Sequence, residues 1–329
     1  SYGMMATGLM WGGNRLVFAA ALAGRICASE PAVPRLEEVS ANSGIQAVLE
    51  NCATENKYMI ETMTGGVAVF DYDNDGLLDL YLVSGAPHPK LEKTDPKYYN
   101  RLYRNLGHFR FEDVTEKAGV RGRGYSMAVA TGDYDNDGWV DLFVAGVNYN
   151  TLYRNRGDGT FEDVTERAGV SGRRADGFKP WSVAAAWLDY DNDGNLDLFV
   201  VNYLVWDYSK EIFCGEPGRY RAYCHPKYYA GLPNTIYRNN GDGTFTDVSE
   251  QAGLSQHVGK GMAVAVADYD LDGYMDIFVT NDTVPNFLFR NLGDGRFEEL
   301  GLVAGVAFND DGRALSSMGA DFRDYDNDG

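Results

Sequence analysis

Basic residues are scarce in this sequence. Its 329 residues include 29 Lys and Arg against 48 Asp and Glu, which gives a formal net charge of −19. A surface with this excess of negative charge repels a nucleic-acid backbone and an anionic membrane surface. We therefore expect no nucleic-acid partner, and cations are the natural partners of the acidic side chains.

Long apolar segments are also lacking, because no run approaches the roughly 18 residues of a membrane span. The most apolar stretch, residues 16–23, follows Arg15 and ends in small residues, which is the pattern of an export signal. We therefore treat 1–33 as a tail and 34–329 as the folded part. Whether the tail is a cleaved signal or a retained packing segment stays open.

Cysteine and histidine are few, with four residues of each. An even number of cysteines fits an oxidising compartment, so we expect an extracellular or periplasmic protein. Cys214 and Cys224 form the first predicted disulfide, and Cys27 with Cys52 forms the second. The cysteines lack CxxC spacing and the histidines are scattered, which argues against a zinc site.

Proline is rare, with 10 residues, whereas glycine is abundant, with 39. This balance indicates many tight turns, and the turns belong to a repeat. The motif Asp-x-Asp-x-Asp-Gly-x-x-Asp begins at residues 71, 133, 189 and 268, and a fifth copy begins at 324. One unit is about 56 residues long, and the longest interval contains an insertion at about 203–233.

Each repeat predicts four strands. Small apolar residues precede the acidic motif, β-branched and aromatic residues follow it, and a Gly-rich hairpin closes the unit. Four strands per unit, repeated radially, are typical of a β-propeller blade. We therefore expect an all-β fold of about four blades. Because the sequence also holds the first strand of a fifth blade, either it is a fragment or a partner completes the ring.

The acidic motif predicts a cation site. Carboxylates at positions 1, 3, 5 and 9 and the carbonyl at position 7 can surround one hard cation, and Gly at position 6 permits the sharp bend. An oxygen-only ligand set predicts Ca²⁺, about one ion per loop, and fits Mg²⁺ less well. The candidate ligands are Asp71, Asp73, Asp75, Leu77 and Asp79; Asp133, Asp135, Asp137, Trp139 and Asp141; Asp189, Asp191, Asp193, Asn195 and Asp197; Asp268, Asp270, Asp272, Tyr274 and Asp276; and Asp324, Asp326 and Asp328.

Two other interpretations of the motif fit less well. An EF-hand shares its first six positions but needs Glu at position 12, where the four complete copies have Leu82, Val144, Val200 and Val279. Acidic turns that only solvate a sheet edge would not require four copies with the same spacing and the same glycine.

With these loops the sequence resembles the FG-GAP/VCBS repeat family of calcium-loop propellers. The segments 61–68 and 281–286 and the Gly-Asp-Gly-Thr-Phe hairpins also resemble secreted bacterial proteins of the ASPIC/UnbV type, which are similar to cartilage acidic protein. The resemblance covers residues 34–329. It implies a calcium-stabilised propeller in an exported protein with a role in interaction or adhesion, and it supplies no reaction.

No catalytic motif accompanies the repeats. Glu61 is the best isolated carboxylate outside the loops, but no His or second acid lies at a recognisable spacing from it. We therefore expect no enzyme. The first hypothesis is a binding or adhesion module for a protein or carbohydrate, the second a structural subunit of an assembly or filament joined through residues 1–33, and the third a lyase on a propeller scaffold.

The insertion is rich in aromatic residues around Cys214 and Cys224. Such rings can stack on sugars, but packing of a disulfide-held loop on the propeller is the favoured interpretation. We interpret the glycosylation sequon at Asn281 as the end of a strand, where its residues have a structural role.

Overall fold

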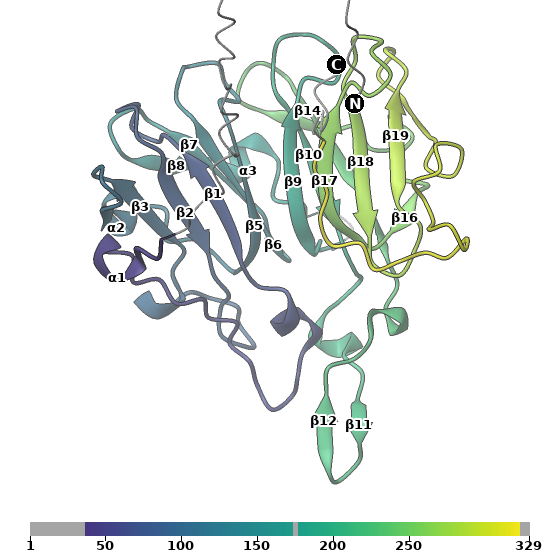
Figure 1. Cartoon of the computed structure of the whole chain (residues 1–329), viewed down its shortest axis with the longest axis horizontal. Helices are drawn as coiled ribbons and strands as arrows, with labels where there is room; N and C mark the ends of the chain where they lie inside the picture. The colour runs from purple at the N-terminus through teal and green to yellow at the C-terminus, as the bar shows by residue number, and fades with distance from the viewer. Residues whose placement is uncertain (1–36, 174–176, 323–329) are drawn as a thin grey trace, which may run out of the picture. The chain divides into compact units, whose positions relative to one another are not determined.

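The computed structural model describes residues 37–173 and 177–322 (Figure 1). The tail at 1–33 and the fifth loop, with Asp324, Asp326 and Asp328, lie outside the described residues. The described chain confirms the all-β prediction, with four antiparallel sheets of four strands and two small ribbons of two strands. In three sheets the strands follow the sequence, and in the third blade the insertion separates β10 from β14.

The strands of the first two blades are β1 (Gly66–Phe70), β2 (Asp79–Val83), β3 (Arg101–Asn105), β4 (Phe111–Asp113), β5 (Tyr125–Gly132), β6 (Asp141–Val147), β7 (Thr151–Asn155) and β8 (Phe161–Asp163). Those of the last two blades are β9 (Ser182–Leu188), β10 (Asp197–Asn202), β14 (Thr235–Asn239), β15 (Phe245–Asp247), β17 (Gly261–Ala267), β18 (Asp276–Asn281), β19 (Phe287–Asn291) and β20 (Phe297–Glu299). The ribbons are β11 (Cys214–Glu216) with β12 (Tyr220–Ala222), and β13 (Leu232–Pro233) with β16 (Val258–Gly259).

Helical structure is confined to single turns. The α-helical turns are α1 (Ser40–Ser43), α2 (Thr115–Ala118) and α3 (Thr165–Ala168), and the 3-10 turns are η1 (Met59–Thr62), η2 (Pro96–Tyr98), η3 (Tyr208–Lys210) and η4 (Pro226–Tyr228). None of the helices in the described segments has the length and apolar composition that a membrane span requires.

The first strands of neighbouring blades pack against each other, β1 on β5, β5 on β9 and β9 on β17. Small side chains allow this approach, because a Cβ on Gly66 of β1 would lie 2.9 Å from Ala128 Cα of β5. This close packing confirms the expected inner strands of small residues. The described sheets form part of a propeller and do not close a ring.

The core lies between the faces of adjacent sheets. Alternate residues of β6 face different neighbouring sheets. Leu142 and Val144 pack in a cluster with the first blade, and Phe143 and Ala145 pack in a cluster with the third. Every residue of β6 is consequently buried. In β1, by contrast, Val67 and Val69 are more than half exposed, because no described sheet covers that face.

The helical turn α1 takes the place that the last turn of a preceding blade would occupy. Its cap, Gly44, has φ of 84°, and a Cβ there would lie 2.4 Å from Phe111 O of β4. Gly119 after α2 faces Phe161 O in the next blade in the same way, and Gly169 after α3 faces Phe245 O. The turn α1 with its glycine cap is therefore built like the ends of the first two blades.

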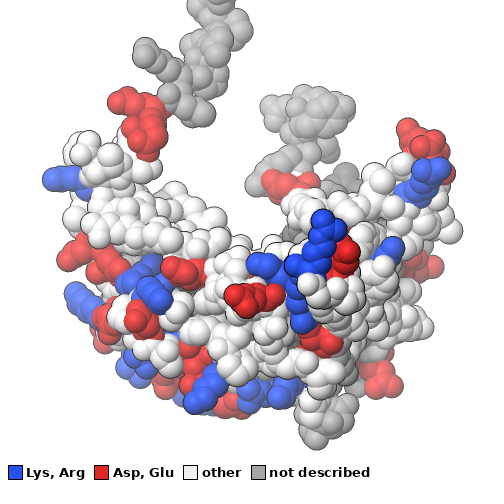
Figure 2. Space-filling model, turned by 90° about the horizontal axis from the view of Figure 1, so that it is seen from below, with Lys and Arg blue, Asp and Glu red and all other residues white. Residues whose placement is uncertain are grey.

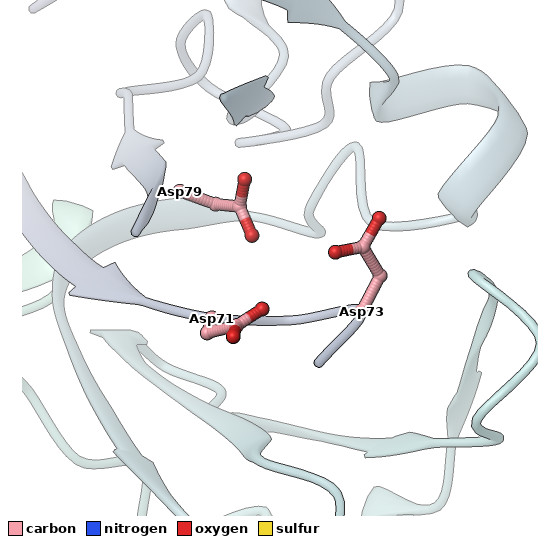
Figure 3. A group of neighbouring side chains, drawn as sticks. All are labelled: Asp71, Asp73 and Asp79. Atoms are coloured by element: carbon pink, nitrogen blue, oxygen red, sulfur yellow. The ribbon is translucent and has the colours of Figure 1, made fainter. Parts of the chain in front are cut away.

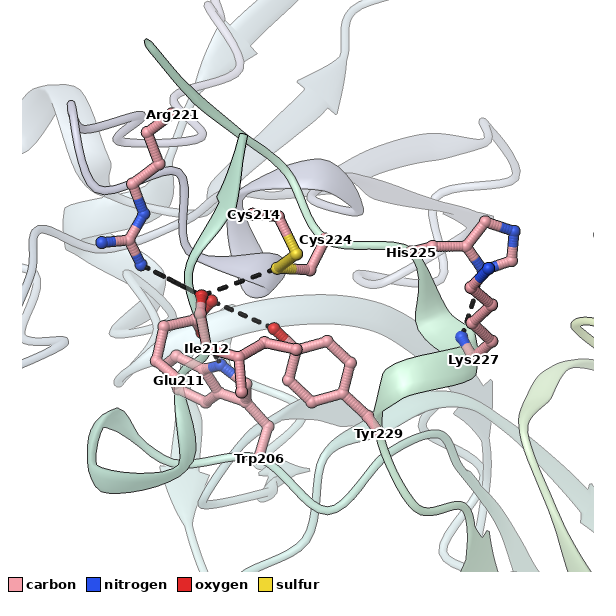
Figure 4. Close-up of a disulfide and its surroundings, with 9 residues drawn as sticks. All are labelled: Trp206, Glu211, Ile212, Cys214, Arg221, Cys224, His225, Lys227 and Tyr229. Atoms are coloured by element: carbon pink, nitrogen blue, oxygen red, sulfur yellow. Dashed lines mark hydrogen bonds and ion pairs between the residues drawn. A yellow bond between two sulfur atoms is a disulfide. The ribbon is translucent and has the colours of Figure 1, made fainter. Parts of the chain in front are cut away.

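The insertion carries the predicted bridge, because Cys214 and Cys224 form a disulfide across the base of the β11–β12 ribbon (Figure 4). Beneath it, Glu211 accepts a hydrogen bond from Tyr229 Oη at 3.0 Å and one from Trp206 Nε1. Of the second predicted bridge, Cys27 lies outside the described residues, and Cys52 is a free thiol.

The aromatic residues of the insertion divide into two groups. Trp206 and Tyr229 are buried in a core cluster that includes residues before β1 and residues of β5, β10 and β18, which supports the packing interpretation. Others remain on the surface with more than a third of their area exposed, namely Phe213, Tyr220, Tyr223 and Tyr228.

We predict that replacing both bridged cysteines, Cys214→Ser with Cys224→Ser, opens the ribbon. Loss of a cross-link over a separation of 10 residues should lower the free energy of opening this loop by about 2 to 3 kcal/mol on the chain-entropy estimate. Limited trypsin digestion should then cut faster after Arg219 and Arg221. The control Cys52→Ser removes an unbridged thiol and should leave the rate unchanged. Equal cleavage of the double variant and the parent would contradict the prediction.

Candidate metal sites

Each acidic motif forms the connection between the first and second strands of a blade. Position 9 opens the second strand and pairs with the last residue of the first, as in Phe70 with Asp79 and Gly132 with Asp141. All four loops therefore lie at the same end of their sheets, and the connections between second and third strands, which differ in length from blade to blade, lie at the other end (Figure 1).

The turn conformation is the same in every loop. Position 4 is left-handed, with φ between 55° and 59° at Asn74, Asn136, Asn192 and Leu271. The glycine at position 6 has φ between 85° and 92°, which side chains strongly disfavour. Position 1 holds this turn, because the Asp71 carboxylate accepts the backbone N–H groups of Asp75 at 3.1 Å and Gly76 at 2.8 Å.

Position 9 is the most buried acid of each loop. Asp79 accepts the N–H of Tyr72 at 2.9 Å on one oxygen and the N–H of Asn105 at 2.7 Å on the other. Its counterparts Asp141, Asp197 and Asp276 repeat both bonds, and all four are fully buried. This carboxylate thus joins the loop to the third strand of its own blade.

Three carboxylates converge in each loop. Asp71 and Asp73 come from the segment after β1 and Asp79 from the start of β2, and their oxygens point toward a common space (Figure 3). One oxygen from each lies within 4.8 Å of the others, and the same holds in the other three loops. The groups are Asp71, Asp73 and Asp79; Asp133, Asp135 and Asp141; Asp189, Asp191 and Asp197; and Asp268, Asp270 and Asp276.

These groups fit a metal ion. The Oδ1 atoms of Asp73, Asp135 and Asp191 are buried and have no hydrogen-bond partner among the described residues. A buried carboxylate oxygen without a partner is costly unless a cation or donor satisfies it. Oxygen donors of this kind suit hard divalent cations.

The position 5 acids lie outside these groups of three. Asp75 accepts the N–H of Leu77 at 2.9 Å and pairs with Arg104 at 3.0 Å, and the position 5 acids of the other loops accept the same N–H from Trp139, Asn195 and Tyr274. Coordination by position 5 and by the position 7 carbonyl stays a prediction.

An arginine on the third strand is a site residue that the motif did not reveal. Arg104 pairs with Asp73 at 2.7 Å, and Arg290 pairs with Asp270 at 2.6 Å. Arg154 and Arg238 approach Asp135 and Asp191 in the same way. The signal was present in the sequence, because the Arg precedes the Asn of every hairpin, but only the register of β3 on β2 places it over the loop.

Asparagine side chains link one loop to the next. Asn155 Nδ2 donates to Val140 O in its own blade at 3.1 Å and to Tyr72 O in the preceding loop at 2.8 Å. Asn74 Nδ2 reaches forward and donates to Gly138 O at 3.0 Å. The later loops repeat both links through Asn239, Asn291, Asn136 and Asn192.

Burial disfavours the charged form of the position 9 carboxyls. Desolvation raises the pKa of Asp79 to about 6, that of Asp197 to about 7 and that of Asp141 to about 8, against a usual 3.8. Backbone hydrogen bonds act in the opposite direction and offset only part of this rise. A bound cation would favour the ionised carboxylate and so compete with the proton.

A second cluster surrounds Glu61, whose side chain is fully buried. It accepts hydrogen bonds from Thr54 Oγ1 at 2.7 Å and from Tyr223 Oη at 2.9 Å. His88 Nε2 lies 3.5 Å from Glu61 Oε1, and His88 Nδ1 lies 2.7 Å from Tyr208 Oη. Sequence spacing did not reveal this acid–base pair, because the fold brings three separate connections together.

Comparison with known proteins gives a family and a few relatives. The FG-GAP-like repeat matches residues 71–144, 133–200, 210–279 and 268–329. Cartilage acidic protein 1 from Mus musculus is 25% identical over 250 residues, which are 73% of this chain and 35% of that protein. The Xenopus tropicalis protein of the same name is 37% identical over 71 residues, which are 21% of this chain and 11% of that protein.

The chain therefore spans about a third or less of the length of these relatives. A solved structure of an Agrocybe aegerita lectin, described as recognising non-reducing terminal N-acetylglucosamine, covers 73% of this chain and 66% of its own. Its TM-score is 0.32 at 18% identity, which is too distant to bear on fold or function.

We predict that Asn155→Ala destabilises the protein more than Asn105→Ala. Both variants lose a bond within their own blade, but only Asn155 also bonds the preceding loop. The extra loss should be about 1 kcal/mol, the usual net value of one hydrogen bond. Urea unfolding of the two variants measures the difference, and equal losses would show that the inter-blade bond contributes nothing.

The raised pKa values predict how pH affects the metal-free protein. Carboxyls with a raised folded-state pKa stabilise the fold below pH about 4, and this contribution disappears as the pH rises through about 6 to 8. In EDTA the Tm should therefore fall between pH 5 and pH 8. A divalent cation should raise the Tm more at pH 8 than at pH 5, because it displaces fewer protons there. A gain in Tm that is independent of pH would contradict this.

Proposed function

The chain belongs to the FG-GAP-like repeat family, and on that premise we propose that it is an exported, calcium-binding β-propeller that acts as a binding module. The observation that carries the proposal is the recurrence of three converging Asp carboxylates at the same place in four blades. One such group could be a solvated acidic turn. Four groups with the same backbone turn and the same buried position 9 acid support a dedicated cation site.

Calcium is the proposed ion because all the candidate ligands are oxygens. Ca²⁺ takes six to eight oxygen ligands in flexible geometry, which suits three carboxylates joined by a loop carbonyl and water. Mg²⁺ requires a smaller octahedral shell and usually binds through fewer carboxylates together with phosphate. The role proposed for the ion is structural, since it would connect β1 to β2, β5 to β6 and their counterparts.

Export is proposed from the disulfide. A bridge between Cys214 and Cys224 forms and persists in oxidising compartments. The binding role is proposed from the other end of the sheets, where long and dissimilar connections surround exposed aromatic side chains such as Tyr228. Loops on a rigid scaffold are the usual site of binding function.

The two alternative functions inferred from the sequence keep their ranking, with the structural subunit second and the lyase third. A subunit joined through the N-terminal tail depends on residues outside the described chain. A lyase gains one observation, the chain of contacts from Tyr208 through His88 to Glu61, which provides an acid–base pair. Release of an unsaturated product from an acidic oligosaccharide, followed by ultraviolet absorbance, would favour the lyase over the binding module.

We predict that calcium removal lowers the Tm by many degrees. At a free calcium concentration 100-fold above its dissociation constant, each site should add about 2.7 kcal/mol to the free energy of unfolding. Calorimetry in EDTA, in calcium and in the same concentration of magnesium measures this effect. The highest Tm should occur in calcium, and identical curves in EDTA and calcium would defeat the proposal.

Equilibrium dialysis then tests a single site. Asp141→Asn should reduce the number of bound calcium ions by one, because its carboxylate belongs to one group only. Asp158→Asn provides the matched control, since Asp158 lies in the β7–β8 turn and accepts a hydrogen bond from the backbone N–H of Thr160. This control loses the same charge and should retain every ion.

A further inference from the structure

A basic pocket lies at the end of the sheets opposite the acidic loops. Its volume is about 550 Å³, and its lining comes from the β2–β3 connection, from the segments that enter β5 and β9, from residues 147–149 and from Tyr208. Six cationic side chains take part, namely Lys90, Lys93, Arg121, Arg123, Arg173 and Lys179. Among the described residues of the lining, the single acid is Glu92.

This concentration of positive charge contrasts with the rest of the molecule. The chain carries a net charge of −19, so an even distribution would leave acids in excess in any pocket. Figure 2 views the molecule from below Figure 1, the side of the β11–β12 ribbon, and Lys and Arg are interspersed with Asp and Glu on that face. Six cations gathered with fewer acids repel one another, which a bound anion would relieve.

Two of the guanidinium groups are held in place by one ring. Arg123 and Arg173 each lie with Cζ 4.8 Å from the centre of the Tyr149 ring. Arg123 also donates to Tyr149 Oη and pairs with Asp163, both at 3.2 Å. Arg173 Nε donates to Asn148 O at 3.2 Å. Side chains fixed in this way lose little conformational entropy when they bind a ligand.

Four of the six cations are available to a ligand. In the described residues, no carboxylate forms an ion pair with Lys90, Arg121, Arg173 or Lys179. Lys93 is different, because its ammonium is buried and donates to the carbonyls of Ser84, Gly85 and Tyr98. We therefore assign Lys93 a structural role in the wall of the pocket and no contact with the ligand.

We propose that this pocket binds a small ligand that carries two or more anionic groups. The available cations come from three separate connections, which suits a ligand with more than one anionic group, and a volume of about 550 Å³ is in the range of small-molecule sites. Carboxylates and phosphates share the required chemistry, since a guanidinium binds both through paired N–H donors. The inference rests on the binding role proposed above and is independent of the calcium sites.

Isothermal titration calorimetry on the whole chain tests the pocket with three probes, each with the same free calcium in both solutions. A galacturonic acid trisaccharide represents acidic sugars, fructose 1,6-bisphosphate represents phosphate esters, and maltotriose is the neutral probe. We expect one of the two anionic probes to bind and maltotriose not to bind. The tighter anionic probe identifies the source of the anionic groups, and added salt should weaken its binding.

The decisive variant is Arg173→Gln with Lys179→Gln, two exposed side chains at the pocket. Its affinity for the anionic probe should fall about tenfold or more. The matched control, Arg219→Gln with Arg296→Gln, removes two exposed charges that pair with Glu216 and Asp294 away from the pocket. The control should bind the probe as the parent does.

Two outcomes would overturn the inference. One is the absence of binding by either anionic probe, and the other is an equal loss in the control, which would mean that only net charge matters. Calcium binding and the calcium-dependent Tm are measured on the same samples. If these remain while the probes fail to bind, the pocket inference is wrong and the calcium function stands.

Discussion

A fully buried aspartate at the start of the second strand is the constraint on which each blade depends. Asp79, Asp141 and Asp197 have no exposed surface, and each accepts two backbone N–H groups, one from its own loop and one from the third strand. Ionised carboxylates are costly in such surroundings unless a cation lies close. The acids at positions 1 and 3 add further negative charge, and the arginine of the third strand offsets only part of that charge.

The loops also determine how the blades are joined. Asn155 donates backward to the preceding loop, and Asn74 donates forward to the following one. Neighbouring sheets are therefore connected twice, by apolar packing between their faces and by this line of hydrogen bonds at one end. Leu271 occupies the position of Asn74 in the fourth loop, so that loop lacks the side-chain amide for a forward link. Uniform loops hold one end of the scaffold, which leaves the other end free to vary.

The end of the sheets opposite the acidic loops is formed by connections that differ from blade to blade. The second-to-third-strand connection is short in the second blade but includes the disulfide ribbon in the third, and the connection of the first blade carries His88 and Lys93. The insertion contacts the connection of the first blade, as Tyr208 does with His88, and it also contacts the segment before β1, as Tyr223 does with Glu61. A basic pocket in an acidic protein therefore arises where dissimilar loops meet.

The sequence by itself determined the repeat, the strand positions and the acidic loops. The small apolar residues before the first acidic motif predicted β1. The Asp spacing predicted carboxylate ligands at positions 1, 3, 5 and 9, of which 1, 3 and 9 converge; both signals are local. Only the tertiary structure decided which residues complete the sites. The arginine of the third strand, the asparagine links, the Glu61–His88 pair and the cations around Tyr149 all depend on segments from different strands or blades. No local spacing encodes such contacts, since strand register and blade packing bring these side chains together.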